Sequence, residues 1–376
     1  MKATEFIEVL EETLEIGFYA GVPDSLLSPF TGEIVNKYGV SDKHIVAANE
    51  GNATGLAAGY HLATGKIPCV YMQNSGEGNV LNPYASLLAP EVYKIPCVFV
   101  VGWRGEPGTK DEPQHVFQGE ITQSLLELLT IQTVVIRKDM TGETLKTVAK
   151  EMKQVLEGGR CVAFIVEKGA LTSENPAKYT NPYTMKREDA LKEIVKGIGE
   201  DIVVSTTGKA SRELFEIREK NGQSHKYDFL TVGSMGHSSS IALSIALEKK
   251  EQKVWCIDGD GAALMHMGAM AVIGAKKPHN FVHIVINNES HETVGGMPTV
   301  AGRIDLVKIA EGCGYQKILQ ASTEEEVAKA VEAAKAADEL TFIEIKAALG
   351  ARSDLGRPTT TAEENKKNFM QYVKEM

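Results

Sequence analysis

No uninterrupted apolar run in this sequence of 376 residues reaches the roughly 18 residues that a membrane-spanning helix requires. The first residues, MKATEFIEVLEETLEIGF, form the pattern of an acidic amphipathic helix. They lack the basic start and following apolar stretch of a signal peptide. We therefore expect a soluble, cytoplasmic protein that does not bind membranes.

Positive charge is also in short supply. The chain has 40 Lys and Arg residues against 50 Asp and Glu residues, for a formal net charge of -10. Such a chain lacks the diffuse basic surface that binds a nucleic acid backbone, so nucleic acid is not an expected partner. A small anionic substrate stays compatible, because a few cationic groups in one cleft can outweigh the global charge.

Cysteine is scarce and scattered. The five cysteines show no C-x-x-C spacing, and four of them lie inside apolar runs that resemble strands. This pattern favours reduced core residues over metal ligands or disulfides. The cysteines are Cys69, Cys97, Cys161, Cys256 and Cys313.

Short β-branched runs alternate with longer helical patterns along the whole chain, which predicts an α/β protein with doubly wound parallel sheets. The predicted strands of the first half are 18–23, 44–49, 68–73, 96–101, 132–137 and 161–166. Those of the second half are 201–206, 227–232, 253–258, 281–286, 316–320 and 341–346. Residues 172–188 contain two Asn-Pro steps and no periodicity, which indicates a linker. We expect two domains, 1–180 and 181–376, without a central third domain.

Two polar clusters follow predicted strands of the second half. Asp260 lies between Gly259 and Gly261 after one strand, and Asn288 follows another. The carboxyl ends of parallel strands are where open α/β sheets bind ligands. Carboxylate and amide oxygens suit Mg²⁺, while the glycines and the amide of Ala262 can approach a diphosphate. Taken singly, each cluster is an ordinary turn or strand exit.

Together, the two clusters resemble the cofactor motif of the thiamine-diphosphate-dependent decarboxylase superfamily. That motif is Gly-Asp-Gly, then 25 residues, then Asn-Asn, as found here. The resemblance implies thiamine diphosphate and Mg²⁺ as cofactors. It also implies that Asp260, Asn288 and the backbone carbonyl of Ser290 hold the metal ion.

Glu50 heads the segment EGNATGLAAGYHLATG, which follows a predicted strand. A Glu at a helix start is often only a dipole-favoured residue. The segment resembles the pyrimidine-binding domain of the superfamily, however, and this implies that Glu50 activates the cofactor by bonding N1′ of its aminopyrimidine. The first domain would then bind the pyrimidine, and the second the diphosphate and Mg²⁺.

The segment Gly233-Ser234-Met235-Gly236 resembles the one that bends the cofactor in this superfamily. The resemblance implies that the carbonyl of Gly233 accepts from the 4′ amino group and that Met235 holds the bent shape. Thr207 occupies the place of a loop close to the cofactor. A Met before a helix is otherwise ordinary core filler.

Three loops after predicted strands of the first half carry candidate substrate ligands and catalytic groups. Cations and hydrogen-bond donors suit an anionic substrate, and a carboxyl or imidazole can move a proton. Each residue can equally be a solvated turn or cap. The candidate ligands are Ser25, Asn74, Ser75, Arg104 and Lys110, and the candidate proton carriers are Asp24 and His115.

The direct junction of two cofactor domains resembles the phosphonopyruvate decarboxylases over nearly the whole chain, and the sulfopyruvate decarboxylases are similar. This implies decarboxylation of phosphonopyruvate to phosphonoacetaldehyde and CO₂ in phosphonate biosynthesis, with sulfopyruvate or another 2-oxoacid as alternative substrates. It also implies a homo-oligomer, at least a dimer, with active sites between subunits. An inactive metabolite-binding subunit is the non-enzyme alternative. A nicotinamide oxidoreductase is disfavoured because no G-x-G-x-x-G follows the first strand of either half.

Overall fold

The computed structural model describes residues 1–294 and 296–376. These residues divide into two compact units. Unit 1 comprises Met1–Tyr179 with Val294, Gly296 and Met297, and unit 2 comprises Thr180–Thr293 and Pro298–Met376. The predicted boundary at residue 180 lies next to this division, but residues 294, 296 and 297 group with unit 1 instead of the second domain. No described residue is left for a third domain.

Unit 1 is built on a six-stranded sheet in the order β2-β1-β3-β4-β6-β5, in which all pairs are parallel. The strands are β1 (Tyr19–Gly21), β2 (His44–Val46), β3 (Cys69–Gln73), β4 (Val98–Gly102), β5 (Gln132–Ile136) and β6 (Val162–Val166). The helices are α1 (Ala3–Thr13), α2 (Ser28–Tyr38), α3 (Glu50–Thr64), α4 (Glu77–Pro83), α5 (Pro113–Leu128) and α6 (Gly142–Glu157).

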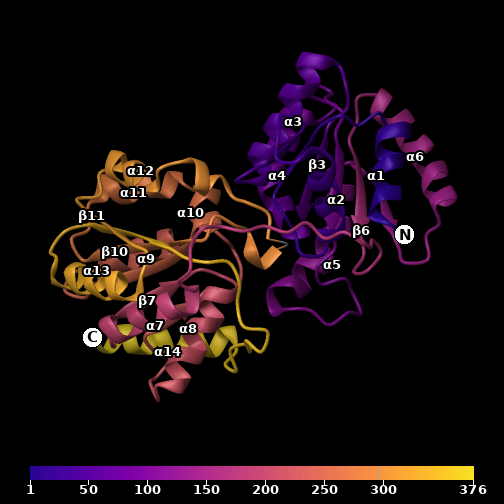
Figure 1. Ribbon diagram of the computed structural model, residues 1–376. Coiled ribbons are helices and arrows are strands. Elements are labelled where there is room, and N and C mark those ends of the chain that lie inside the picture. Colours follow the sequence, from indigo (N-terminus) through magenta and orange to yellow (C-terminus); the bar gives the residue numbers. More distant parts are fainter. Residues whose placement is uncertain (295) are drawn as a thin grey trace. The chain divides into compact units, whose positions relative to one another are not determined.

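The side chains of successive residues in a central strand pack on opposite faces of the sheet, because side chains alternate along a strand. In β4, Val98 and Val100 pack with α1, α2 and α6, whereas Phe99 and Val101 pack with α3 and the residues around Tyr84. Figure 1 shows α3 and α4 on one side of β3, with α1 and α6 on the other. Burial on both faces explains the continuous apolar runs in the sequence.

Unit 2 repeats this architecture with the sheet order β11-β12-β10-β9-β7-β8, again entirely parallel. The strands are β7 (Ile202–Ser205), β8 (Asp228–Leu230), β9 (Val254–Gly259), β10 (Phe281–Asn287), β11 (Lys317–Ala321) and β12 (Thr341–Lys346). The helices are α7 (Arg187–Ile198), α8 (Lys209–Lys220), α9 (Ser238–Glu248), α10 (Asp260–Met265), α11 (Gly268–Lys276), α12 (Leu306–Cys313), α13 (Glu324–Ala336) and α14 (Ala362–Glu375).

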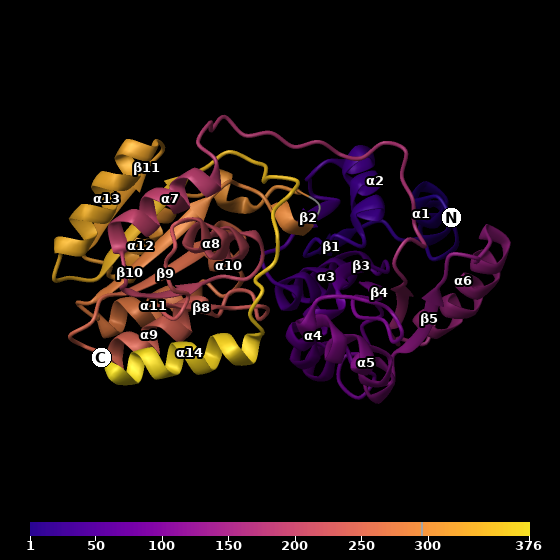
Figure 2. The same cartoon turned by 90° about the horizontal axis from the view of Figure 1, so that it is seen from below.

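The helices of unit 2 also cover both faces of its sheet. Figure 2 shows α7 and α13 on one side of β9 and β10, and α9 and α11 on the other. Strand β8, which follows β7 in the chain, pairs with one edge of β7, and the next strand, β9, pairs with the other edge. Such a topological switch point opens a crevice at the carboxyl ends of the strands, where ligands bind in this class of sheet.

All twelve predicted strands are present, so the α/β prediction with two parallel sheets is confirmed. Strands β1, β2 and β8 are shorter than the predicted runs, because the chain turns away early to form the loops at the carboxyl edge. Within residues 1–294 and 296–376, no helix is both long and apolar enough to cross a membrane.

Candidate cofactor and substrate site

Glu50 begins α3 at the carboxyl end of β2, in unit 1. The side chain of Asn49 caps the helix by accepting from the amide of Gly51 at 2.7 Å. The Glu50 carboxyl is buried, and Asn79 Nδ2 donates to its Oε2 at 2.7 Å. Burial raises the pKa of Glu50, and the Asn79 hydrogen bond opposes the rise. The Glu50 carboxyl is therefore held in a fixed position, and its burial favours the protonated form.

Asp260 begins α10 at the end of β9, in unit 2. Its carboxylate is buried, accepts from the hydroxyl of Thr299, and also accepts from the backbone amide of Asn288. Burial raises its pKa to about 7, although these hydrogen bonds oppose the rise. The two residues that the sequence separates by 28 positions are thus neighbours, as the motif requires.

The end of β10 forms a tight polar turn beside Asp260. Asn288 Oδ1 accepts from the amide of Ser290 at 3.1 Å. Asn287 holds the same turn by accepting from the amide of Glu289 at 3.0 Å and donating to Glu344 at 2.8 Å. The turn presents oxygen atoms at the carboxyl edge of the sheet, where a hard cation can be bound.

The space beside Gly261 in this turn is tight. A Cβ on Gly261 would lie 3.0 Å from Cε1 and Nδ1 of His291, which is itself buried. Burial lowers the pKa of His291 to about 4, so this imidazole is neutral at physiological pH. The buried residue Ala262 continues the helix. A turn of such small residues leaves its backbone open to the close approach of a ligand.

The other cofactor residues predicted in unit 2 lie at the ends of β7 and β8. The Thr207 hydroxyl donates to the carbonyl of Val232 at 2.8 Å, so it joins the two strand ends. In the following turn, Ser234 has a φ of 56° and Gly236 has a φ of 87°. Gly233 and Met235 are half-buried in this turn, which leads into α9.

A group of ion pairs that sequence reasoning missed surrounds Asn288. Glu292 accepts from Asn288 Nδ2 at 3.0 Å, from Lys209 Nζ at 2.7 Å and from Arg187 Nη1 at 2.8 Å. Arg187 is buried and forms a second, two-pronged pair with Glu213 at 2.7 and 2.8 Å. Glu292 is therefore a hub that orients the amide of a candidate metal ligand, as outer-shell carboxylates do. In the sequence, this role of Glu292 is indicated only by its position four residues after Asn288.

The predicted substrate loops of unit 1 bring three residues together. Arg104 donates to both carboxylate oxygens of Asp111, at 2.8 and 2.5 Å, and to Ser25 Oγ at 3.2 Å. Asp24 is buried beside this group, and one of its oxygens has no hydrogen-bond partner among the described residues. Burial raises the pKa of Asp24 to about 6, while the positive charge of Arg104 opposes the rise.

His115 lies in the first turn of α5, near Arg104. It is buried, and its pKa is lowered by burial and then by the charge of Arg104. The imidazole therefore favours its neutral form. The carbonyl of His115 lies so close to Gly105 that a Cβ there would clash at 1.8 Å, which fixes the Arg104 loop against α5.

The remaining predicted ligands have other surroundings. Asn74 is fully buried, and its amide bonds the carbonyl of Arg104 at 2.8 Å and the hydroxyl of Thr122 at 2.9 Å. Its side chain thus holds the Arg104 loop, and both of these hydrogen bonds use its amide nitrogen as the donor. Direct contact of Asn74 with a substrate stays a prediction. Ser75 accepts from Gln73 at 2.7 Å, and Lys110 is exposed.

The residues present fit thiamine diphosphate and Mg²⁺. Unit 2 offers the oxygens of Asp260 and Asn288 beside a turn of small residues, and unit 1 offers the buried, protonatable carboxyl of Glu50. Among the residues that the structure describes, the buried carboxyl of Asp260 accepts from the Thr299 hydroxyl and from backbone amides, which carry no charge. A bound divalent cation would compensate its charge, which otherwise raises the free energy of the folded state.

Comparisons with known proteins agree with this class. Residues 2–126 match the family model for the N-terminal TPP binding domain of thiamine pyrophosphate enzymes, and residues 206–345 match the model for their C-terminal TPP binding domain. The fold and the two matching domains thus define a thiamine pyrophosphate enzyme.

Three curated relatives narrow the class. A phosphonopyruvate decarboxylase from Streptomyces viridochromogenes is 33% identical over 94% of this chain and 90% of its own length. One from Streptomyces hygroscopicus is 30% identical over 95% of this chain and 90% of its own length. A sulfopyruvate decarboxylase from Methanosarcina acetivorans is 30% identical over 80% of this chain and 81% of its own length. The chain belongs to the family of the phosphonopyruvate decarboxylases.

Proposed function

We propose that this protein decarboxylates phosphonopyruvate to phosphonoacetaldehyde and CO₂, using thiamine diphosphate held through Mg²⁺. The proposal rests on the presence of both buried Glu50 in unit 1 and the turn of Asp260 and Asn288 in unit 2, in a chain that matches phosphonopyruvate decarboxylases over most of its length. The 30% identity to a sulfopyruvate decarboxylase supports sulfopyruvate as the second candidate substrate.

Bound thiamine diphosphate would supply the nucleophilic carbon and the electron sink that decarboxylation of a 2-oxoacid requires. We assign to Glu50 the proton shared with pyrimidine N1′, since burial favours its protonated form. Asp260, Asn288 and the Ser290 carbonyl would hold Mg²⁺, and the backbone at Gly259, Gly261 and Ala262 would face the diphosphate. The Gly233 carbonyl, Met235 and Thr207 would contact the rest of the cofactor.

In unit 1, we assign the anionic end of the substrate to Arg104 and Ser25, since the guanidinium carries the charge and the hydroxyl lies beside it. Asp24 would move a proton, because a pKa of about 6 lets the same carboxyl donate and accept near neutral pH. His115, which favours its neutral form, can accept a proton nearby. Lys110 and Ser75 would contact the substrate from the rim of this group, and Asn74 would support the Arg104 loop.

The test is reconstitution. Protein is stripped with a chelator, dialysed, and assayed for CO₂ release from phosphonopyruvate, sulfopyruvate and pyruvate, with Mg²⁺ and thiamine diphosphate added singly and together. Turnover should need both additions, and Asp260→Ala should abolish it along with cofactor binding. Asp338→Ala, which removes a carboxylate whose side chain is 90% exposed in the same unit, is the matched control.

Full turnover in rigorously stripped protein would contradict the cofactor assignment, and a preference for pyruvate would contradict the substrate. The same preparation tests the expected homo-oligomer, because light scattering of the eluting protein gives its mass directly. A reconstituted, active monomer would overturn that expectation.

A further inference from the structure

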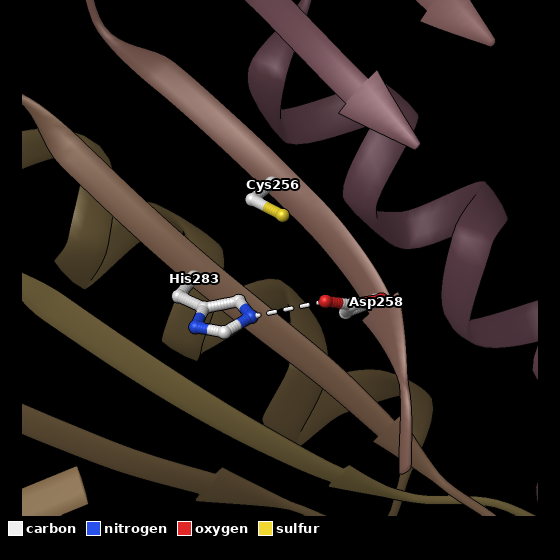
Figure 3. A group of neighbouring side chains, drawn as sticks. All are labelled: Cys256, Asp258 and His283. Carbon is white, nitrogen blue, oxygen red and sulfur yellow. Dashed lines mark ion pairs between the residues drawn. The ribbon is translucent and has the colours of Figure 1, made fainter. Parts of the chain in front are cut away.

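A mixed group of polar side chains lies inside the sheet core of unit 2. Cys256 and Asp258 alternate along β9, and His283 on β10 is the register partner of Cys256. The three side chains therefore extend from the same face of the sheet, as Figure 3 shows. All three are buried, with exposed fractions of 1% or less. The sulfur, one imidazole nitrogen and one carboxylate oxygen lie within 4.8 Å of one another.

Among residues 1–294 and 296–376, two atoms of this group have no hydrogen-bond partner. His283 Nε2 and Asp258 Oδ2 are buried without a hydrogen bond, and they lie 3.5 Å apart, in the contact that Figure 3 marks with a dashed line. That separation is too long for a good hydrogen bond. Native proteins rarely leave such atoms unsatisfied, so each one calls for an explanation.

The other polar atoms of the group are held from outside. The hydroxyl of Ser238 donates to Asp258 Oδ1 at 3.2 Å, and the hydroxyl of Tyr315 lies 3.0 Å from His283 Nδ1. A histidine that binds a metal through one nitrogen typically has its other nitrogen hydrogen-bonded in this way. Ser238 and Tyr315 thus leave Oδ2 and Nε2 directed toward each other and toward the sulfur of Cys256.

We propose that Cys256, Asp258 and His283 bind one transition metal ion of the Zn²⁺ type. Ligand atoms about 2.1 Å from tetrahedral zinc lie roughly 3.4 Å from each other, which is close to the Oδ2 to Nε2 separation. Thiolate, imidazole and carboxylate are also the three ligand types that zinc takes from proteins.

Charge balance supports the same assignment. Binding forms a metal–sulfur bond and releases the thiol proton to solvent, so the site combines a dication with a thiolate, a carboxylate and a neutral imidazole. The net charge is zero, which suits complete burial. The interpretation of all five cysteines as plain core residues would then be wrong for Cys256.

This ion would be distinct from Mg²⁺. Asp258 precedes Asp260 by two residues, but its side chain packs within the sheet core, whereas Asp260 begins α10 at the strand end. Mg²⁺ prefers oxygen ligands and exchanges readily, whereas a thiolate-bound ion sealed in a core should resist chelators until the fold opens.

The experiment measures metal content without using activity. Untagged protein, expressed with zinc in the medium and dialysed against EDTA, is analysed by plasma mass spectrometry and then unfolded in guanidinium with a chromogenic zinc chelator. We expect one zinc ion per chain that survives dialysis and is released only on unfolding. Cys256→Ala should lose the ion, and Cys97→Ala, which removes an equally buried cysteine of unit 1, should keep it.

If Cys256→Ala does not fold, wild-type protein refolded with Co²⁺ gives the decisive reading. A thiolate-to-cobalt charge-transfer band is expected on refolding, and its absence would overturn the proposal. A folded wild-type protein without any transition metal above background would also overturn it, as would a Cys256→Ala variant that keeps the full zinc content. In those cases, the three side chains form only a polar contact within the core.

Discussion

Gly76 leaves the space that the carboxyl of Glu50 fills. A Cβ on Gly76 would come within 2.6 Å of both Cγ and Oε1 of Glu50, which is shorter than any real contact of that kind. The conformation of Gly76 is an ordinary right-handed one, with φ at -72°. A side chain at position 76 would therefore force the Glu50 side chain to move, although the backbone there is unstrained.

This relationship predicts that Gly76→Ala folds but displaces Glu50. We expect slower exchange of the cofactor C2 hydrogen with solvent, while Glu50→Gln should slow it more strongly because the amide cannot supply the proton. Exchange is read by NMR of acid-quenched cofactor. Gly78→Ala is the matched control, since a Cβ there meets nothing within 4 Å. Wild-type exchange in Glu50→Gln would refute the assigned role.

A second prediction concerns the hub at Glu292. The Glu292→Gln substitution removes the charge between Lys209 and Arg187 and leaves one of the two cations without a carboxylate. Loss of an outer-shell partner typically weakens metal binding by roughly 10- to 100-fold, and we expect that loss in the Mg²⁺ and cofactor affinity. Calorimetric titration measures it, with Glu325→Gln on an exposed ion pair as control. Unchanged affinity would show that Asn288 needs no such support.

The sequence predicted the sheets and the edge of each sheet where the site lies, but not the contacts inside the site. Strands buried on both faces leave continuous apolar runs, and the cofactor motif has a fixed spacing, so both can be recognised locally. The hydrogen bond from Asn79 to Glu50 joins residues 29 positions apart, and the pair of Arg187 with Glu292 joins residues 105 positions apart. Such pairs depend on how the elements pack, which no local pattern encodes.

The surroundings of Asn74 could not be predicted from the sequence either. Its type and its place after β3 suggested a substrate ligand, and only the packing of α5 shows that Thr122 and the Arg104 carbonyl occupy its amide. Asp111 likewise gave no signal, because its pairing with Arg104 depends on the path of the intervening loop.

A third prediction follows from Glu77, which begins α4. Both of its carboxylate oxygens are buried without a hydrogen-bond partner among the described residues, and burial raises its pKa from 4.5 to about 9. Since the folded-state value is the higher one, the folded chain keeps a proton that the unfolded chain releases. Stability should therefore fall as the pH rises from 4.5 toward 9.

Glu77→Gln removes this titration. We compare the free energy of unfolding of the variant with that of the wild type at each pH. This difference should favour the variant by on the order of a few kcal/mol more at pH 8 than at pH 5. Urea unfolding of the cofactor-free protein at the two pH values measures the difference, and Glu91→Gln on the surface serves as control. An equal effect at both pH values would show that Glu77 does not ionise in this range.

The last prediction concerns how the substrate anion is recognised. Arg104 carries the positive charge of the predicted pocket, but in this structure both Nε and Nη2 bind Asp111, and only Nη1 extends to Ser25. A phosphonate must therefore bind at the Nη1 edge or displace Asp111. A charge-assisted hydrogen bond contributes roughly 1.5–3 kcal/mol, so its loss should cost about 10- to 150-fold in kcat/KM. Arg104→Ala should lower kcat/KM for phosphonopyruvate by that factor and leave slow pyruvate turnover nearly unchanged. Sulfopyruvate should lie between them, because a sulfonate carries one charge fewer.

The Asp111→Asn substitution separates the two modes of binding. If the phosphonate displaces Asp111 from Arg104, the uncharged asparagine side chain should compete less well and KM for phosphonopyruvate should fall. If it binds only at Nη1, KM should stay or rise as the guanidinium loses its anchor. Lys110→Ala, on the exposed part of the same loop, is the control for a general change in surface charge. An Arg104→Ala variant that slows phosphonopyruvate and pyruvate equally would remove Arg104 from the phosphonate pocket and leave only a role in holding the loop.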